Sequence, residues 1–201
     1  MSIFVEQLMD HEPERRKSVL EWEIFQKNVV DPIVALNDSR FAEEEIVRTI
    51  GILNINCVSF NFRKKEKFSG RGLYPTLSLL SHSCLANARY EGLLYMWLTS
   101  DHWLSDNNIS IPVSSDSARF VSVRARRQIS PGEEITIQYV PASLGQPRRR
   151  LELSDWYFDC QCERCHDVTE RATFVSALKC PQCREGLILP ESQDNSLWRC
   201  R

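Results

Sequence analysis

The placement of the cysteines constrains this chain more than any other feature of its sequence. Six of its eight cysteines lie between positions 160 and 200, in the stretches FDCQCERC, LKCPQC and LWRC. Cys160, Cys162 and Cys165 form a C-x-C-x-x-C motif, which can supply three thiolates to a tetrahedral zinc ion that needs four ligands. A zinc site here therefore needs a fourth ligand from another part of the chain.

The remaining cysteines of the tail allow two pairings. Cys180 and Cys183 form a C-x-x-C half-site, and with Cys200 they resemble a zinc ribbon whose fourth ligand would fall beyond the last residue. We therefore expect the chain to be cut through this motif. Alternatively, Cys162 and Cys165 pair with Cys180 and Cys183 across a 14-residue spacer. Spacing alone leaves both schemes open.

The expected location of the protein favours metal binding over disulfides. The 201-residue chain is 42% hydrophobic and 26% charged, which is ordinary for a globular protein. Its first residues lack the apolar core and cleavage site of a secretion signal, and no apolar run approaches the ~20 residues of a membrane span. We therefore expect an intracellular protein, in the nucleus, the cytoplasm or both, with no membrane partner. In a reducing compartment, clustered cysteines bind metal more often than they form disulfides.

The charge pattern argues against nucleic acid as a partner. The formal net charge is −2, so the chain has no overall basic footprint. Short basic clusters at 63–65, 124–127 and 148–150 read as solvated faces, and no platform of aromatic and basic side chains stands out. We expect no direct contact with nucleic acid.

Hydrophobic periodicity predicts helices followed by short strands. Apolar residues at three- and four-residue intervals predict an amphipathic helix from Val19 to Leu36, whose apolar stripe contains Trp22, Phe25, Val29, Ile33 and Leu36. It lies within a helical stretch over 3–37 that is interrupted or kinked at Asp31-Pro32. A second helix is expected over 42–53. After Gly51, strands are expected at 54–62, 88–98, 119–129 and 133–140, with a turn at Pro131-Gly132. A polar hairpin loop over 99–117 and a helix over 148–156 complete the prediction.

A short run near the middle of the chain, LLSHSCLAN at 79–87, places His82 two residues before Cys84. This pair is open to three interpretations: a nucleophilic Cys–His dyad, two metal ligands, or ordinary loop residues. No third group that would orient the histidine is evident, which argues against the dyad.

Three motifs in order carry a family resemblance: LLSHSCLAN at 79–87, PGEEITIQYV at 131–140 and WYFDCQCERC at 156–165. Together they resemble the SET-domain protein-lysine methyltransferases of the SET and MYND (SMYD) family, in its SmydA-like branch. The resemblance covers nearly the whole chain. It implies an α+β, SET-type fold of small antiparallel β-sheets with a helical insert and a zinc-binding tail. The implied domains are a helical insert over 1–50, the C-terminal part of a SET domain over 51–158 and a cysteine-rich post-SET region over 159–201.

The same resemblance implies a reaction and the residues for it. The reaction is transfer of a methyl group from S-adenosyl-L-methionine to a lysine of a protein substrate, and Tyr139 matches the catalytic tyrosine. The residues that match the cofactor site are Asn56, Ser81, His82 and Phe158. Zn²⁺ is implied at Cys84 together with Cys160, Cys162 and Cys165, so Cys84 is a ligand rather than a nucleophile. A second zinc ribbon would use Cys180, Cys183 and Cys200.

Several positions depart from the family pattern. Ser81 stands where the family has Asn, and Ala86 replaces a Pro. Val58 replaces an aromatic residue of the lysine channel, and Trp156 stands where several relatives have a Tyr. No G-x-G cofactor strand or MYND finger precedes the helices, and the G-x-G at 70–72 belongs to the later segment.

These departures set two expectations against each other. The first is a methyltransferase in full-length form, of which this chain is a fragment that binds S-adenosylmethionine weakly or not at all. The alternative is a catalytically inactive SET scaffold that acts as a zinc-stabilised interaction or transcriptional-regulatory module. In either case we expect a monomer whose partners are a protein substrate presenting a lysine and chromatin or regulatory proteins.

Overall fold

The computed structural model of the chain describes residues 3–36, 40–62, 68–92, 121–191 and 197–201. These residues belong to two compact units. Among these described residues, the first unit contains those up to Leu79 and those of 91–122, and the second contains those of 80–90 and those from Val123 on.

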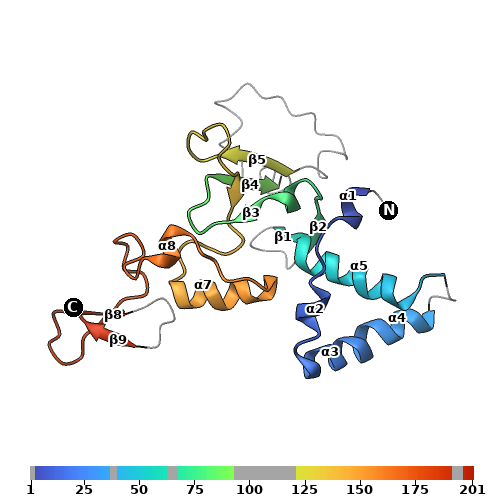
Figure 1. Cartoon of the computed structure of the whole chain (residues 1–201), viewed down its shortest axis with the longest axis horizontal. Helices are drawn as coiled ribbons and strands as arrows, with labels where there is room; N and C mark the ends of the chain where they lie inside the picture. The colour runs from blue at the N-terminus through green and yellow to red at the C-terminus, as the bar shows by residue number, and fades with distance from the viewer. Residues whose placement is uncertain (1–2, 37–39, 63–67, 93–120, 192–196) are drawn as a thin grey trace. The chain divides into compact units, whose positions relative to one another are not determined.

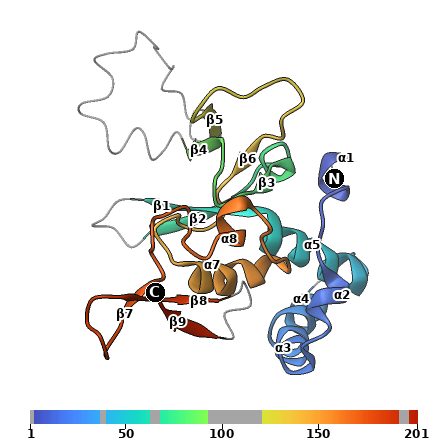
Figure 2. The same cartoon turned by 60° about the vertical axis from the view of Figure 1, so that its left-hand side comes forward.

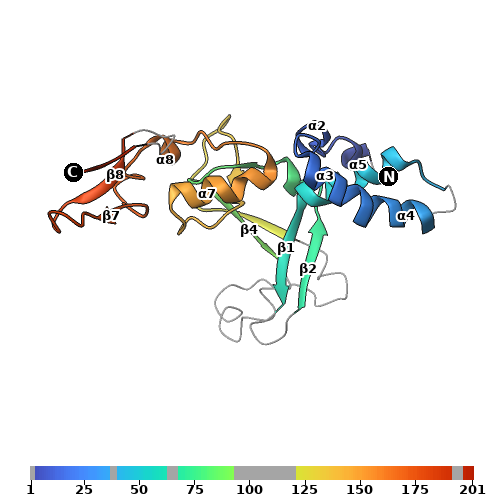
Figure 3. The ribbon, with the colours of Figure 1, turned by 90° about the horizontal axis from the view of Figure 1, so that it is seen from below.

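The first unit begins with helices (Figure 1). Their bounds are α1 Ile3–Glu6, α2 Glu12–Arg15, α3 Val19–Phe25, the π-helical turn η1 Gln26–Val30, α4 Asp31–Leu36 and α5 Glu43–Asn56. The π turn ends directly before Asp31, so the expected irregularity at Asp31-Pro32 takes the form of one widened turn. In Figures 1 and 3, α3, η1 and α4 follow one another as a single rod alongside α5.

A small apolar core holds this rod to α5. Val30, Ile46 and Val47 are buried together, with Trp22 and Phe25 packed against them. The predicted apolar stripe is therefore confirmed at its N-terminal end.

The C-terminal end of the stripe was predicted wrongly. Val30 is fully buried instead of Val29, and Ile33 and Leu36 are 40% and 79% exposed. The π turn accommodates an additional residue, which rotates the side chains after it around the helix axis.

Helix α5 has clear signals at both ends. At its start, the Glu45 carboxylate accepts the backbone N–H of Ala42 at 2.9 Å, and three glutamates occupy the positively polarised first turn. At its end, the side-chain amide of Asn56 donates to the carbonyl of Ile52 at 2.9 Å. The helix therefore runs three residues beyond the predicted Leu53.

A hairpin follows the helices. Strand β1 (Cys57–Phe62) pairs antiparallel with β2 (Phe68–Leu73), with Cys57 opposite Leu73 (Figure 3). The strand predicted from Asn54 thus begins at Cys57, because the preceding residues are helical. A short 3₁₀ turn, η2 (Leu77–Leu79), leads out of the hairpin.

Four short strands come next: β3 (Ser81–His82), β4 (Ala88–Gly92), β5 (Val121–Ala125) and β6 (Thr136–Ile137). Strand β4 pairs with β5, and β3 pairs with β6 in parallel, so that His82 lies opposite Ile137. The strand predicted over 133–140 is only two residues long, and β5 is shorter than the strand predicted over 119–129. The turn expected at Pro131-Gly132 is confirmed, and Gly132 has a φ of +82°, which favours glycine.

The tail of the chain combines helices with a small sheet. Its elements are α7 Gln146–Leu153, η4 Ser154–Trp156, α8 Glu163–His166, β7 Leu178–Lys179, β8 Leu187–Pro190 and β9 Trp198–Cys200. The predicted helix over 148–156 corresponds to α7 and η4. The three strands form an antiparallel sheet with β8 in the middle (Figure 2).

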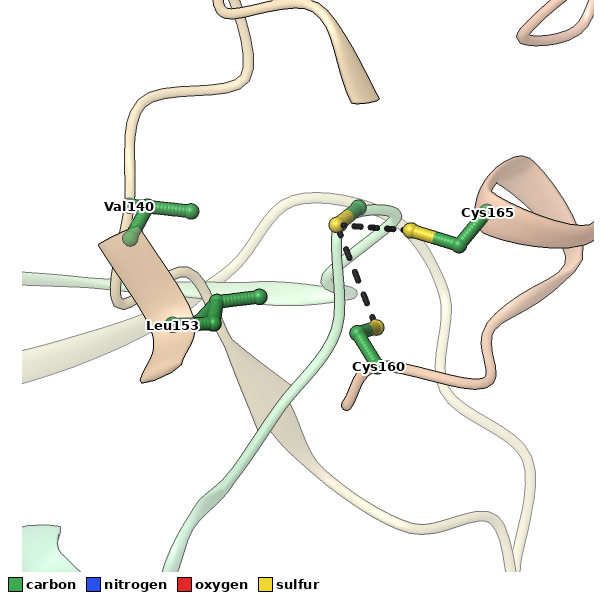
Figure 4. Packing of buried hydrophobic residues seen from close by; sticks show 5 residues of the cluster. Val140, Leu153, Cys160 and Cys165 are labelled. Atoms are coloured by element: carbon green, nitrogen blue, oxygen red, sulfur yellow. Dashed lines mark hydrogen bonds between the residues drawn. The ribbon is translucent and has the colours of Figure 1, made fainter. Parts of the chain in front are cut away.

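The core of the second unit is built around sulfur. Val140 and Leu153 are buried with the cysteines at 84, 160 and 165 (Figure 4). Leu153 is only 1% exposed. The cysteine-rich segment is therefore part of the core of its unit.

The α+β class with small, mostly antiparallel sheets is confirmed. The domain boundaries predicted at 50 and 158 stay predictions. The loop expected over 99–117 and the outer part of the strand expected over 88–98 lie outside the described residues. Within the described part of the chain, no helix is both long enough and apolar enough to cross a membrane.

Candidate functional site

Four cysteines from two distant segments converge in the second unit. Cys84 follows β3, whereas Cys160, Cys162 and Cys165 lie just before α8 or within it. Their sulfur atoms all lie within 4.8 Å of one another. The Sγ of Cys84 is 3.9 Å from that of Cys160 and 3.5 Å from that of Cys165. Dashed lines mark these two contacts in Figure 4.

This arrangement fits a zinc ion. Four thiolates at ~2.3 Å from a tetrahedral zinc lie about 3.8 Å from one another, which matches the observed sulfur separations. The grouping unites Cys84 with the C-x-C-x-x-C motif, as the family resemblance implied. The rival ribbon, which pairs Cys162 and Cys165 with Cys180 and Cys183, is not the grouping that the structure has.

Four thiols this close together cannot all lose their protons unless a cation offsets the charge. The pKa of Cys160 is lowered because the thiols of Cys162 and Cys165 donate to it. The pKa of Cys84 is raised, first by its hydrogen bond with Cys160. The sulfurs thus share their protons, since four thiolates this close repel one another. A divalent cation would replace those protons and keep all four sulfurs deprotonated.

A second group of cysteines lies at the small tail sheet. Cys180 and Cys183 follow β7, Cys200 ends β9, and their sulfurs lie within 4.8 Å of one another. The pKa of Cys183 is lowered to about 7, first by the backbone N–H of Gly186, which donates to its sulfur at 3.3 Å. The pKa of Cys200 is raised to about 11 by its two neighbouring thiols. Within the described residues this group offers three ligands for a metal ion.

His82 connects the first cysteine group to Tyr139. Its Nδ1 accepts the backbone N–H of Tyr139 at 3.0 Å, and its Nε2 lies 3.3 Å from the sulfur of Cys84. Because Nδ1 is an acceptor, the proton of the neutral ring is on Nε2, which then donates to the sulfur. The histidine is therefore a hydrogen-bond bridge, and the short distance between His82 and Cys84 does not make them a nucleophilic pair.

Three aromatic side chains gather around His82. The Tyr139 ring lies 5.3 Å from the imidazole, and the Phe158 ring lies 5.9 Å from it, between centroids. Tyr139 also contacts Trp156 at 5.4 Å and meets Phe158 edge to face at 6.3 Å. Phe158 keeps 37% of its surface exposed. The structure thus brings Tyr139, His82 and Phe158, all predicted from the sequence, into one aromatic group.

The hydroxyl of Tyr139 is held in place and stays protonated. It donates to the backbone carbonyl of Leu80 at 2.7 Å. Burial raises the pKa of Tyr139, and the negative charge of Glu134 raises it further. At neutral pH the group is therefore a neutral phenol, able to donate one hydrogen bond and accept others.

The remaining predicted cofactor residues are placed differently. Ser81 is exposed and lies opposite Thr136 in the parallel pairing of β3 with β6. Asn56 belongs to the first unit, where its amide also donates to the carbonyl of Met9 at 2.8 Å. Ser81 is therefore the neighbour of His82 in β3, whereas Asn56 is the last residue of α5 in the first unit.

Sequence reasoning missed two groups of polar residues in the second unit. Asn87 is 2% exposed, accepts the backbone N–H of Thr136 at 2.9 Å and donates to the carbonyl of Glu134 at 2.8 Å. Arg149 and Glu170 form an ion pair that is almost completely buried. An Asn at the end of the LLSHSCLAN run was a visible signal, whereas nothing distinguished Arg149 from the arginines on either side of it.

Comparisons with known proteins identify the family of this chain. A family model described as "SET domain" matches residues 3–140. The SET domain-containing protein SmydA-8, isoform A, of Drosophila melanogaster is 32% identical over 164 residues, which cover 78% of this chain and 30% of that protein. The mouse histone-lysine N-methyltransferase Smyd1 is 26% identical over 150 residues, covering 74% and 28% of the two chains. The human histone-lysine N-methyltransferase SMYD3 is 35% identical over 122 residues, covering 60% and 23%.

The chain therefore spans less than a third of the length of each of these curated relatives. The matched family model reaches Val140, the residue after Tyr139, and leaves the cysteine-rich tail outside it.

Proposed function

Since this chain belongs to the SET domain family and has SMYD-type relatives, we propose that its protein transfers methyl groups from S-adenosylmethionine to lysine side chains of protein substrates. The observation that carries the proposal is the grouping of Tyr139, His82 and Phe158 beside the parallel β3–β6 pair. Two of the relatives are named as histone-lysine methyltransferases, and histones are therefore the first substrates to test.

The reaction asks little covalent chemistry of the protein. When bound, S-adenosylmethionine would supply a methyl group on a positively charged sulfur. The methyl would pass to a neutral lysine amine in line with that sulfur, which would leave as a neutral thioether. The protein has to align the two groups and exclude water. Tyr139 would contribute a neutral hydroxyl at a fixed position, and Phe158 would cover an aromatic part of the cofactor with its exposed face.

His82 and the first cysteine group would position these side chains. The imidazole fixes the backbone of Tyr139 through Nδ1 and faces Cys84 through Nε2. A zinc ion on the four cysteines would join the segment that carries Trp156 and Phe158 to the segment after β3. The free energy of metal binding would then contribute to ordering the aromatic group.

We further propose that Cys180, Cys183 and Cys200 bind a second zinc ion, with a fourth ligand in addition to these three. Their sulfurs lie close enough together for this. The small β7–β8–β9 sheet connects the C-x-x-C turn to Cys200. We therefore assign this ion a structural role, the stabilisation of the tail sheet.

One alternative function has its own support. Ser81 lacks the amide that the family has at this position, and the hydroxyl of Tyr139 is already engaged by the Leu80 carbonyl. Both observations fit a scaffold that has kept its zinc and its aromatic packing but has lost methyl transfer. Such a protein would act through protein partners.

The test uses the full-length protein. S-adenosylmethionine is titrated by calorimetry, zinc is counted on the same sample, and methyl transfer from labelled cofactor is measured on histones and on a lysine peptide array. The proposal predicts cofactor binding, methylation and a loss of methylation in Tyr139→Phe with binding retained. Zinc retention without cofactor binding would instead establish the scaffold.

A further inference from the structure

The most deeply buried charge in the described part of the second unit lies against the first cysteine group. Arg149 of α7 has no exposed surface, and its neighbours Arg148 and Arg150 are far more accessible. Its Nε donates to the sulfur of Cys84 at 3.2 Å, and one terminal nitrogen donates to the sulfur of Cys165 at 3.6 Å. One guanidinium thus contacts two of the four sulfurs and comes from neither segment that carries them.

The other side of the guanidinium is bound to Glu170. The second terminal nitrogen of Arg149 donates to this carboxylate, and also to the carbonyl of Leu144 at 2.6 Å. Glu170 is 1% exposed and accepts further hydrogen bonds from Arg164 at 3.0 Å and from the backbone N–H of Gln146 at 3.1 Å. It also accepts the hydroxyl of Ser176.

Charge explains why such a network lies beside the cysteines. Four thiolates around a divalent ion carry a net charge of −2, and a buried charge is costly unless it is paired. His82 offers the sulfurs a neutral donor, whereas Arg149 offers a full positive charge. A guanidinium is not deprotonated in proteins, so Arg149 is a cation beside the sulfurs of Cys84 and Cys165.

Glu170 also fixes a segment whose backbone needs support. Glu170, Arg171, Ala172 and Phe174 all have positive φ, between 52° and 61°, although none is glycine. Such conformations persist only where surrounding contacts determine them. Asp167 supplies some of these contacts through the backbone N–H groups of Thr169 and Arg171, each at 2.8 Å. Glu170 anchors the segment to α7 through Arg149 and the backbone N–H of Gln146, and the hydroxyl of Ser176 accepts the same N–H at 2.8 Å.

We propose that Arg149 is a positioning residue of the metal centre with two roles. Its charge retains the metal by offsetting the charge of the four thiolates. Its ion pair with Glu170 makes the order of residues 167–177 depend on whether the first cysteine group holds a metal ion. The inference rests on the metal binding proposed above, because the charge it offsets is that of the loaded cysteines.

The experiment measures zinc release from the zinc-loaded full chain to a coloured chelator, with amide hydrogen exchange followed over 167–177. A Cys84→Ser variant identifies the release phase of the first site, and Cys183→Ser identifies that of the second. In Arg149→Gln the first phase is expected to be 10- to 100-fold faster, the usual effect of losing a partner of a metal ligand. The second phase is expected to stay unchanged, as are both phases in the matched control Arg148→Gln.

A second variant separates charge from packing. Glu170→Gln keeps the shape of the side chain but leaves the charge of Arg149 to act on the sulfurs alone. We expect its first zinc phase to stay within threefold of the parent or to slow, while exchange over 167–177 becomes at least tenfold faster. Equal acceleration of zinc release in Arg149→Gln and Glu170→Gln would mean that the pair only packs, and would overturn the proposal.

Two further outcomes are decisive. If Arg149→Gln is obtained only in unfolded form, Arg149→Lys replaces it, since lysine keeps the charge but cannot hold two sulfurs and a carboxylate together. The Arg149→Lys variant is expected to release zinc about tenfold faster, and unchanged release overturns the inference.

A parent chain with no zinc release phase from the first site would overturn the metal proposal and this inference with it. A first-site release phase whose rate does not change when Arg149 is replaced overturns the inference alone.

Discussion

The Nδ1 atom of His82 accepts the backbone N–H of Tyr139 at 3.0 Å. This one hydrogen bond joins the SHSC run after η2 to the end of the GEEITIQY run, alongside the parallel pairing of β3 with β6. It also determines which nitrogen of the imidazole faces the sulfur of Cys84. This backbone contact therefore fixes the position of Tyr139 and also makes the Nε2 of His82 a donor to the sulfur of Cys84.

The first prediction concerns the tautomer of His82. In the zinc-loaded chain, long-range ¹H–¹⁵N spectra should show His82 with its proton on Nε2, because Nδ1 is occupied as an acceptor. His82→Phe should fill the space but release the Tyr139 backbone, and the resonances of residues 137–141 should shift most. A ring protonated on Nδ1 would contradict the observed hydrogen bond.

The second prediction is the pH behaviour of Tyr139. Its pKa is raised because burial and Glu134 disfavour the phenolate, so its ring should titrate above the usual value of about 10. The native fold then disfavours the charged form. Stability from this group is complete below the unfolded-state pKa and is lost as the pH rises through the folded one. Tyrosine ¹³Cζ labelling measures the midpoint, with Tyr139→Phe for assignment, and a midpoint below that of an exposed tyrosine would refute the account.

The third prediction separates the two leucines of α7. Leu153 is 1% exposed and packs with Val140 and the cysteines, whereas Leu151 is 60% exposed on the same helix. Leu153→Ala should lower the free energy of unfolding by about 2–5 kcal/mol through the lost burial and the cavity. Leu151→Ala should change it by less than about 0.5 kcal/mol. Urea unfolding of zinc-loaded samples provides both values, and equal effects would contradict the packing described for α7.

The fourth prediction tests Asn87. Replacing it by alanine leaves the backbone N–H of Thr136 without its acceptor and the carbonyl of Glu134 without its donor. An unsatisfied group in a partly buried position costs about 1–3 kcal/mol, so Asn87→Ala should destabilise the chain by about that amount. The exposed Asn28 serves as a control, since Asn28→Ala should leave the unfolding midpoint almost unchanged. Comparable midpoints for the two variants would show that Asn87 does not stabilise β6.

The fifth prediction counts metal. Cys160→Ser should reduce the zinc content by one ion per chain, and Cys183→Ser should independently reduce the occupancy of the second site. Cys57 belongs to neither group, so Cys57→Ser should retain the full content.

Removing zinc with a chelator should also change hydrogen exchange unevenly. Exchange should rise over α7 and α8, which surround the first group, while α5 of the first unit should stay protected by its own core. Uniform loss of protection across α5, α7 and α8 would show that the metal stabilises more than the unit that holds it.

The helices illustrate what periodicity can predict and where it fails. The apolar residues Trp22 and Phe25 were placed correctly, because spacing of three and four residues dictates one face of an α-helix. Ile33 and Leu36 were not, because the π turn rotates the helix after Val30 and no residue type announces such a turn. Helix α5 outlasted its predicted end because the side chain of Asn56 caps the last turn, a contact that forms only in the folded chain.

By itself, the sequence determined which residue types are available to the candidate site. The C-x-C-x-x-C spacing called for metal, and the order of three short motifs indicated the fold family, with Tyr139, His82 and Cys84 as candidate residues. These are properties of residue type and local spacing, which survive in an unfolded chain.

The tertiary structure alone decided which groups meet. It joined Cys84 to three cysteines far along the chain, gave His82 its donor and its acceptor, and buried Arg149 while leaving Arg148 and Arg150 accessible. Three successive arginines are alike as a sequence, and only the direction of α7 decides which one faces the sulfurs. Burial and long-range hydrogen bonds depend on how the whole chain packs, and local spacing does not contain that information.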